Sequence, residues 1–173
     1  MIDKDDIIAE HLPYEIDMLR YAYQRLPDLQ KKAEINVFIE CFCVHARNLL
    51  DFFWDGRPEQ KNYAVARQFT SGSYSPFSGK NPKADGLYGK LNDQIVHVTY
   101  GRIDITEQKI GDEERAYLKN LIGREIDNFG GHLAAAYRHL WTYKGGSPIE
   151  KRNAIAIGAT GPIDPTSPRR SSP

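Results

Sequence analysis

The sequence has few cysteines, no excess of either charge and no long hydrophobic run. Its two cysteines, Cys41 and Cys43, are separated by one residue inside an apolar segment. On a helix, two such neighbours point in nearly opposite directions, so they neither form a disulfide with each other nor share a metal ion. A reduced, cytoplasmic protein is the simplest interpretation.

Positive and negative side chains balance, since 23 lysines and arginines are matched by 23 aspartates and glutamates. A neutral chain lacks the broad positive field that non-specific nucleic-acid binding uses, although a local basic patch remains compatible with it. No stretch approaches the roughly 20 apolar residues that a membrane span requires. The acidic N-terminal segment also lacks the apolar centre of a signal peptide, so a cytoplasmic protein with no membrane partner is expected.

Several motifs that carry known chemistries are missing. The chain has no phosphate-binding loop, no dinucleotide-binding glycine fingerprint, no Gly-x-Ser-x-Gly elbow and no zinc-binding cysteine set, so no cofactor is predicted. His132 and His139 are seven residues apart on one predicted helix. They lie about 10 Å from each other along that helix, too far for these two alone to hold one metal ion. A metal site would need His45 or His97 in addition.

What is present is helical periodicity. Apolar residues recur at helical spacing in four segments, which are residues 5–26, 30–55, 84–101 and 112–144. The segment 30–55 is apolar around most of its circumference, which is typical of a central, largely buried helix. Pro13 predicts a break or a new first turn in the first segment. The last segment contains Gly130 and Gly131, but its apolar stripe stays in phase across them, so one continuous or slightly kinked helix is expected.

These segments predict an all-α fold, because no pair of alternating strands accompanies them. The expected architecture is a four- to five-helix up-and-down bundle over residues 1–144. Within it, residues 71–82 have the composition of a long loop. Residues 145–173 are rich in Pro, Ser, Gly and Arg and have no periodicity, so a flexible tail that is disordered on its own is expected there.

A narrow polar stripe follows the central predicted helix. Asn36, Glu40, Arg47 and Asp51 fall within an arc of about 60°. Because unpaired buried charge is costly, this stripe must face water, a partner or a polar pocket. Two interpretations stay open: a solvated seam with ordinary ion pairs, or a pocket or dimer seam lined by Glu40, Arg47 and Asp51. His45 lies on the other side of this helix and is expected to be a hydrogen-bonded core histidine.

The third predicted helix carries a second polar face. Lys90, Asp93, Gln94 and His97 share it, with Tyr100 at its edge. Asp93 precedes His97 by about one turn, so its carboxylate is placed to orient the imidazole. A histidine held in this way can act as a general acid or base near neutral pH, and an ordinary surface pair is the alternative.

Two segments together resemble known proteins. Phe38 to Phe53 reads Phe-Ile-Glu-Cys-Phe-Cys-Val-His-Ala-Arg-Asn-Leu-Leu-Asp-Phe-Phe, and Leu91 to Arg102 reads Leu-Asn-Asp-Gln-Ile-Val-His-Val-Thr-Tyr-Gly-Arg. The pair resembles a group of small, uncharacterised bacterial helical proteins with a His-Ala-Arg-Asn-Leu-hydrophobic-Asp-Phe helix and a His-hydrophobic-Thr-Tyr-x-Arg helix. More distantly, the architecture is similar to HEPN domains, helical bundles that often dimerise and in many members cleave RNA.

The resemblance implies a homodimer and a site built from two helices. An active HEPN pattern has an arginine a few positions before a histidine, and His97 matches the histidine. The arginine position falls on Lys90 or Asn92, neither of which is arginine. Lysine lacks the bidentate fork of a guanidinium, so Arg47 of the neighbouring helix would have to supply that group.

Three hypotheses follow from these residues. The first is a HEPN-like binding or regulatory module that is dimeric and engages RNA or a nucleotide. The second is a divergent metal-independent ribonuclease, such as a toxin or phage-defence effector, in which His97 carries out the acid–base chemistry. The third is a metal-dependent helical bundle. The candidate catalytic residues are His97, Arg47, Lys90 and Asn92, and the candidate binding residues are Glu40, Asp51, Asp93, Tyr100 and Arg102.

Overall fold

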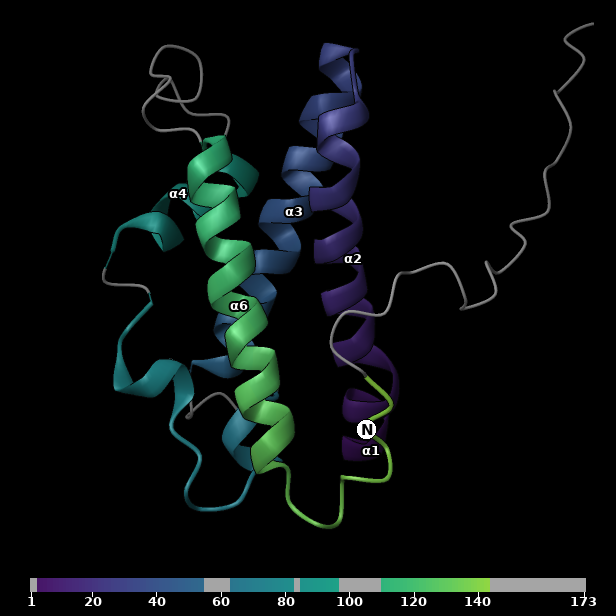
Figure 1. Cartoon of the computed structure of the whole chain (residues 1–173), viewed down its shortest axis with the longest axis vertical. Helices are drawn as coiled ribbons and strands as arrows, with labels where there is room; N and C mark the ends of the chain where they lie inside the picture. The colour runs from purple at the N-terminus through teal and green to yellow at the C-terminus, as the bar shows by residue number, and fades with distance from the viewer. Residues whose placement is uncertain (1–2, 55–62, 83–84, 97–109, 144–173) are drawn as a thin grey trace, which may run out of the picture.

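The computed structural model describes residues 3–54, 63–82, 85–96 and 110–143. Over these residues the chain is helical, and its one β-type pairing is an isolated bridge between Thr70 and Leu133. Figure 1 shows three long helices, α2, α3 and α6, side by side, with the shorter α4 against α3 and α6. The all-α prediction is therefore confirmed. The tail predicted for residues 145–173 lies outside the described residues.

The first helical stretch is interrupted near Pro13, as the sequence predicts. It consists of α1 (Lys4–Asp6), a wider π turn (Ile7–His11) and α2 (Leu12–Arg25). Proline has no N–H for the helical ladder, and its ring clashes with the carbonyl four residues back, so a regular helix cannot pass through it unchanged. The Leu12 amide donates instead to the Ile7 carbonyl, five residues back, which is the π-helical pattern.

The central helix, α3 (Lys32–Phe53), forms where it was predicted and is buried over its C-terminal half. Phe42, Ala46, Leu50 and Phe53 have no exposed surface. The N-terminal half is more open, with Val37 62% exposed. Figure 1 shows why: α2 and α3 extend beyond the end of α6, so these first turns have fewer helices around them. The prediction of a buried helix is thus confirmed from Phe42 onward.

The predicted loop over residues 71–82 packs against the bundle. It contains a short 3-10 turn (Pro76–Gly79), and another such turn (Ala66–Gln68) precedes it. Tyr74 and Phe77 are buried in the hydrophobic core beside Phe129 of α6 and Phe53 of α3. This connection therefore belongs to the folded core.

Glu125 of α6 (Asp112–His132) fastens this connection to the bundle. The residue is 3% exposed, and its carboxylate accepts hydrogen bonds from the Tyr74 hydroxyl at 2.6 Å and the Phe77 amide at 2.7 Å. The Asn128 side chain donates a third bond at 3.0 Å. A buried carboxylate requires such donors in place of water. They also hold Phe77 and Ser78 in left-handed backbone conformations, with φ of 50° and 54°, which L-residues adopt at some energetic cost.

The predicted extension of the last helix to residue 144 is wrong. Gly130 and Gly131 stay helical as expected, but α6 ends at His132. Here tertiary pairing replaces the helix: the Ser71 amide donates to the His132 carbonyl, and the Ala134 amide donates to the Phe69 carbonyl, both at 2.9 Å.

Beyond this bridge the chain folds back over the core. Trp141 packs on Phe129 with 5.5 Å between ring centroids and lies over Gly130. A Cβ atom at Gly130 would be 3.0 Å from the indole nitrogen, so the missing side chain allows this close approach. The apolar residues after His132 thus contact the core from a returning segment.

The remaining helix, α4 (Leu87–Val96), was predicted over residues 84–101, and residues 97–101 lie outside the described part. Leu91 of α4 is fully buried and Leu87 packs beside the core, in line with the predicted apolar stripe. In the described part of the chain, every helix is too short or too polar to span a membrane.

Replacing Glu125 with alanine should strongly destabilise the fold, because the Tyr74 hydroxyl and the Phe77 amide would lose their acceptor. Each buried donor that loses this bond costs about 1–3 kcal/mol, so the two together predict a loss of about 2–6 kcal/mol in urea denaturation. Glu113→Ala, an exposed change at the start of the same helix, serves as the control and should change stability by less than about 0.5 kcal/mol. Equal stability of the two variants would contradict this role of Glu125.

Candidate functional site

The polar stripe of α3 faces α4. The Tyr88 hydroxyl lies 2.9 Å from each carboxylate oxygen of Asp51 and donates to it. Arg47, one turn earlier on α3, places its Nε 3.9 Å from Asp51 Oδ2, within ion-pairing distance. The stripe therefore borders a seam between two helices, which we call the α3–α4 seam and define by Arg47, Asp51, Tyr88 and Asn92.

Lys90 points to a different neighbour. Its ammonium group lies 2.5 Å from Glu114 Oε1 on α6. Glu114 also accepts a hydrogen bond from the Gly111 amide at 2.9 Å, which satisfies a free N–H at the start of α6. Burial by itself would raise the pKa of the Glu114 carboxyl, but the bonds from Lys90 and Gly111 outweigh it, so the net pKa is lowered. Lys90 is thus already paired with a carboxylate.

Arg115 is a third charged residue in this region, and sequence reasoning missed it. It is 7% exposed, donates to the Ile110 carbonyl at 2.5 Å and pairs with Asp112. A possible signal was its place in the first turn of a helix just after three acidic residues, where an arginine has carboxylates within reach. The pairing explains how this cation can be buried.

Residues of the same region influence the pKa of the Cys43 thiol. Burial raises the pKa of the Cys43 thiol to about 12, with the Arg115 charge opposing and the Glu40 charge reinforcing the shift. At neutral pH this thiol is protonated and therefore a poor nucleophile and metal ligand. Glu40 and Arg115 are thus close enough to act on one interior group, where α3 approaches α6.

Two polar atoms in the α3–α4 seam are left over. Within the described structure, Arg47 Nε and Asn92 Oδ1 are buried and have no hydrogen-bond partner. Asn92 follows Tyr88 by one turn, and Arg47 precedes Asp51 by one turn, so both lie on the helix faces that carry the Tyr88–Asp51 contact. The seam thus contains one donor, Arg47 Nε, and one acceptor, Asn92 Oδ1, without a hydrogen bond among the described residues.

The other predicted site residues divide into two groups. Asp93 is exposed on α4. His97, Tyr100 and Arg102 lie outside the described residues, so a convergence of His97 with Arg47 stays a prediction.

His45 is a core histidine, as predicted. It is buried, and its Nδ1 lies 2.7 Å from Glu15 Oε2 of α2. Asn48 donates to the same carboxylate oxygen at 3.1 Å. These bonds join α2 to α3 and account for the polar residues on this side of the central helix.

No metal-binding cluster occurs among the described residues, where no three His, Cys, Asp or Glu side chains come together. His132 Nδ1 lies 2.8 Å from the Asn128 carbonyl oxygen of its own helix. The metal-dependent hypothesis therefore gains no support from this part of the chain.

No protein-family model, no curated protein and no solved structure matches the chain. A proposal about its function therefore has to be argued from the side chains and their contacts.

The ion pair of Lys90 with Glu114 predicts a pH-dependent contribution to stability. Because the pKa of folded Glu114 lies below its usual value of 4.5, the ionised carboxylate stabilises the fold above that pH, and the contribution is lost as pH falls through the folded pKa. Glu114→Gln should therefore reduce stability by up to about 1 kcal/mol near pH 7, and the difference should shrink as the pH falls below 4.5 and the carboxylate becomes protonated. Thermal denaturation across this range, with Glu113→Gln as the matched control, tests it. A difference independent of pH would contradict the assignment.

Proposed function

We propose that the chain is a HEPN-like helical binding or regulatory module that acts as a homodimer and engages RNA or a nucleotide without cleaving it. The observation that carries this proposal is that the cations around the predicted catalytic positions already have carboxylate partners. Arg47 pairs with Asp51, and Lys90 pairs with Glu114. A reduced cytoplasmic setting fits its two free cysteines.

These pairs favour binding over catalysis for an electrostatic reason. A ribonuclease needs preorganised positive charge where negative charge develops on the phosphorane. A cation fixed against a carboxylate delivers little net charge to such a group, and freeing it would leave the carboxylate exposed to the same anion. The divergent ribonuclease remains the alternative outcome of the test below.

The dimer proposal is supported by apolar side chains on the outer face of α2 and α3. Tyr14 and Val37 are 56% and 62% exposed, and Tyr21 is also exposed. Tyr21 packs against Phe38, so at this point the apolar surface spans both helices. Exposed aromatic and aliphatic residues that cluster in this way are typical of protein interfaces.

Incubation of the purified protein with single-stranded RNA and with nucleotides tests the ligand. Retention of one of these without strand cleavage is expected, for the wild type and for His97→Ala alike. Cleavage by the wild type that disappears in His97→Ala would replace the proposal with the ribonuclease alternative. Absence of both binding and cleavage would contradict both.

Light scattering in solution tests the dimer. A particle of twice the chain mass is expected, and Val37→Glu should convert it to a monomer because it places a charge in the apolar face. Lys32→Glu, an exposed change at the start of the same helix, is the control and should stay dimeric. A monomeric wild type would contradict this part of the proposal.

A further inference from the structure

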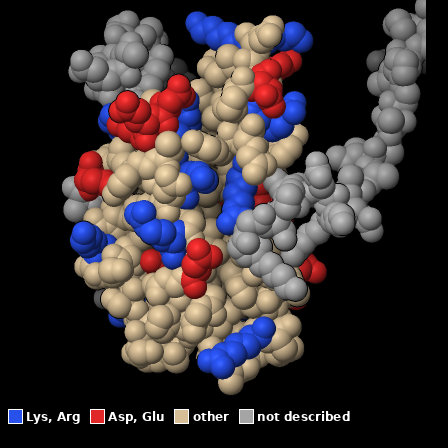
Figure 2. Space-filling model, viewed as in Figure 1, with Lys and Arg blue, Asp and Glu red and all other residues tan. Residues whose placement is uncertain are grey.

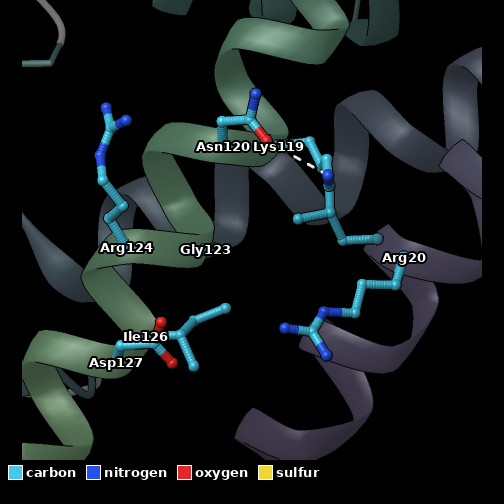
Figure 3. Close-up of a pocket in the computed structure, with 8 residues that line it drawn as sticks. Arg20, Lys119, Asn120, Gly123, Arg124, Ile126 and Asp127 are labelled. Atoms are coloured by element: carbon cyan, nitrogen blue, oxygen red, sulfur yellow. Dashed lines mark hydrogen bonds between the residues drawn. The ribbon is translucent and has the colours of Figure 1, made fainter. Parts of the chain in front are cut away.

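A groove separates α2 from α6 on the face shown in Figure 2, where several Lys and Arg side chains lie across the middle of the molecule. Its volume is about 340 Å³, within the lower range of small-molecule sites. Arg20 of α2 points across it toward α6, and Lys119 and Asn120 lie at one end, as Figure 3 shows. Asp127 lies at the other end, and Arg124 extends from the rim.

Positive charges outnumber negative charges in this groove. Three cations, Arg20, Lys119 and Arg124, line it together with one acid, Asp127. In the ranges that the structure describes, none of these cations has a carboxylate within ion-pairing distance. The α3–α4 seam differs in this respect, since its arginine is paired. The groove therefore offers an external anion cations that are not in ion pairs.

Two of the cations are held in position by aromatic rings. The Arg20 guanidinium lies 4.8 Å from the centroid of the Tyr143 ring, and the Lys119 ammonium lies 5.5 Å from that of Tyr23. Lys119 also donates to Asn120 Oδ1 at 3.2 Å, drawn as the dashed line in Figure 3. Such contacts already restrict these long side chains, so less conformational entropy is lost when an anion binds.

Arg20 is half-buried without a matching charge in contact. Burial lowers the pKa of its guanidinium, and the more distant charges of Asp17 and Asp127 only partly oppose this. A bound anion would restore the electrostatic stabilisation that Arg20 loses with its water.

The interior of the groove suits the organic part of a ligand. Leu19 and Ile126 lie at its floor and are almost fully buried, so they close it on the side of the core. At Gly123, no atom lies within 4 Å of the position that a Cβ would occupy. The absent side chain thus leaves open space beside the cations.

We infer that this groove between α2 and α6 binds the phosphate group of a small organic phosphate of nucleotide size, with Arg20 and Lys119 as the phosphate ligands. The inference rests on the proposed binding function and adds its site and ligand class. Arg20 supplies a planar fork for two phosphate oxygens, and Lys119 supplies a point charge. Asn120 offers the organic part a polar partner, and the open space at Gly123 gives it room.

Titration calorimetry with AMP, ADP and pyrophosphate, beside a single-stranded oligonucleotide, tests this inference. Arg20→Gln and Lys119→Gln should each weaken nucleotide binding by about tenfold or more, since each removes a charged hydrogen bond. Gly123→Leu should abolish binding while keeping the helix, because leucine is a better helix former than glycine and its side chain would fill the groove. Controls are Lys32→Gln, outside the groove, and Gly89→Leu, a helical glycine of α4 that also has open space around it.

The outcomes distinguish a failure of the groove as the binding site from a failure of the proposed binding function. Nucleotide binding that all three groove variants weaken and both controls keep would support the inference. Nucleotide binding that the groove variants retain would overturn the site but leave the proposed function standing. Binding of the oligonucleotide alone would overturn the ligand class and leave an RNA-binding module. Binding of none of these probes would overturn the inference and the proposed function together.

Discussion

A charged side chain that leaves water needs a partner in its place, and this constraint arranges the polar residues of the bundle. Glu125 receives three donors and thereby fixes the connection between α3 and α4 to α6. Arg115 can be buried because Asp112 and the Ile110 carbonyl accept its hydrogen bonds. Where a cation at the surface of a groove lacks such a partner, a bound anion can supply one.

The end of α6 connects the fold to that groove. Because the chain pairs with residues 69–71 after His132, it leaves the helix and returns across the core through Trp141. This return brings Tyr143 under the Arg20 guanidinium. A helix that continued to residue 144 would have carried the tyrosine away along its own axis. The aromatic support of Arg20 is therefore a consequence of the same tertiary pairing that ends α6.

The two polar regions of the molecule differ in what they can do. Along the α3–α4 seam, the charges of Arg47 and Asp51 largely cancel, and the unused groups are one buried donor and one buried acceptor. Such a seam holds helices in register and offers little net positive charge. Between α2 and α6, three cations outnumber one acid. Among the described residues, the groove between α2 and α6 therefore offers an anion more net positive charge than the α3–α4 seam does.

Periodicity alone was sufficient to predict the all-α class, the position of α3 and the interruption at Pro13, because helical spacing and the missing N–H of proline act locally. The Arg47–Asp51 pair was also predictable, since both residues lie on one helix, one turn apart. The end of α6, the burial of Arg115 and the cations between α2 and α6 were not predictable. Arg20 and Lys119 are distant in sequence, and only the packing of α2 against α6 brings them together. Pairing between such segments depends on contacts that neither segment encodes by itself, so tertiary structure decided where free charge remains.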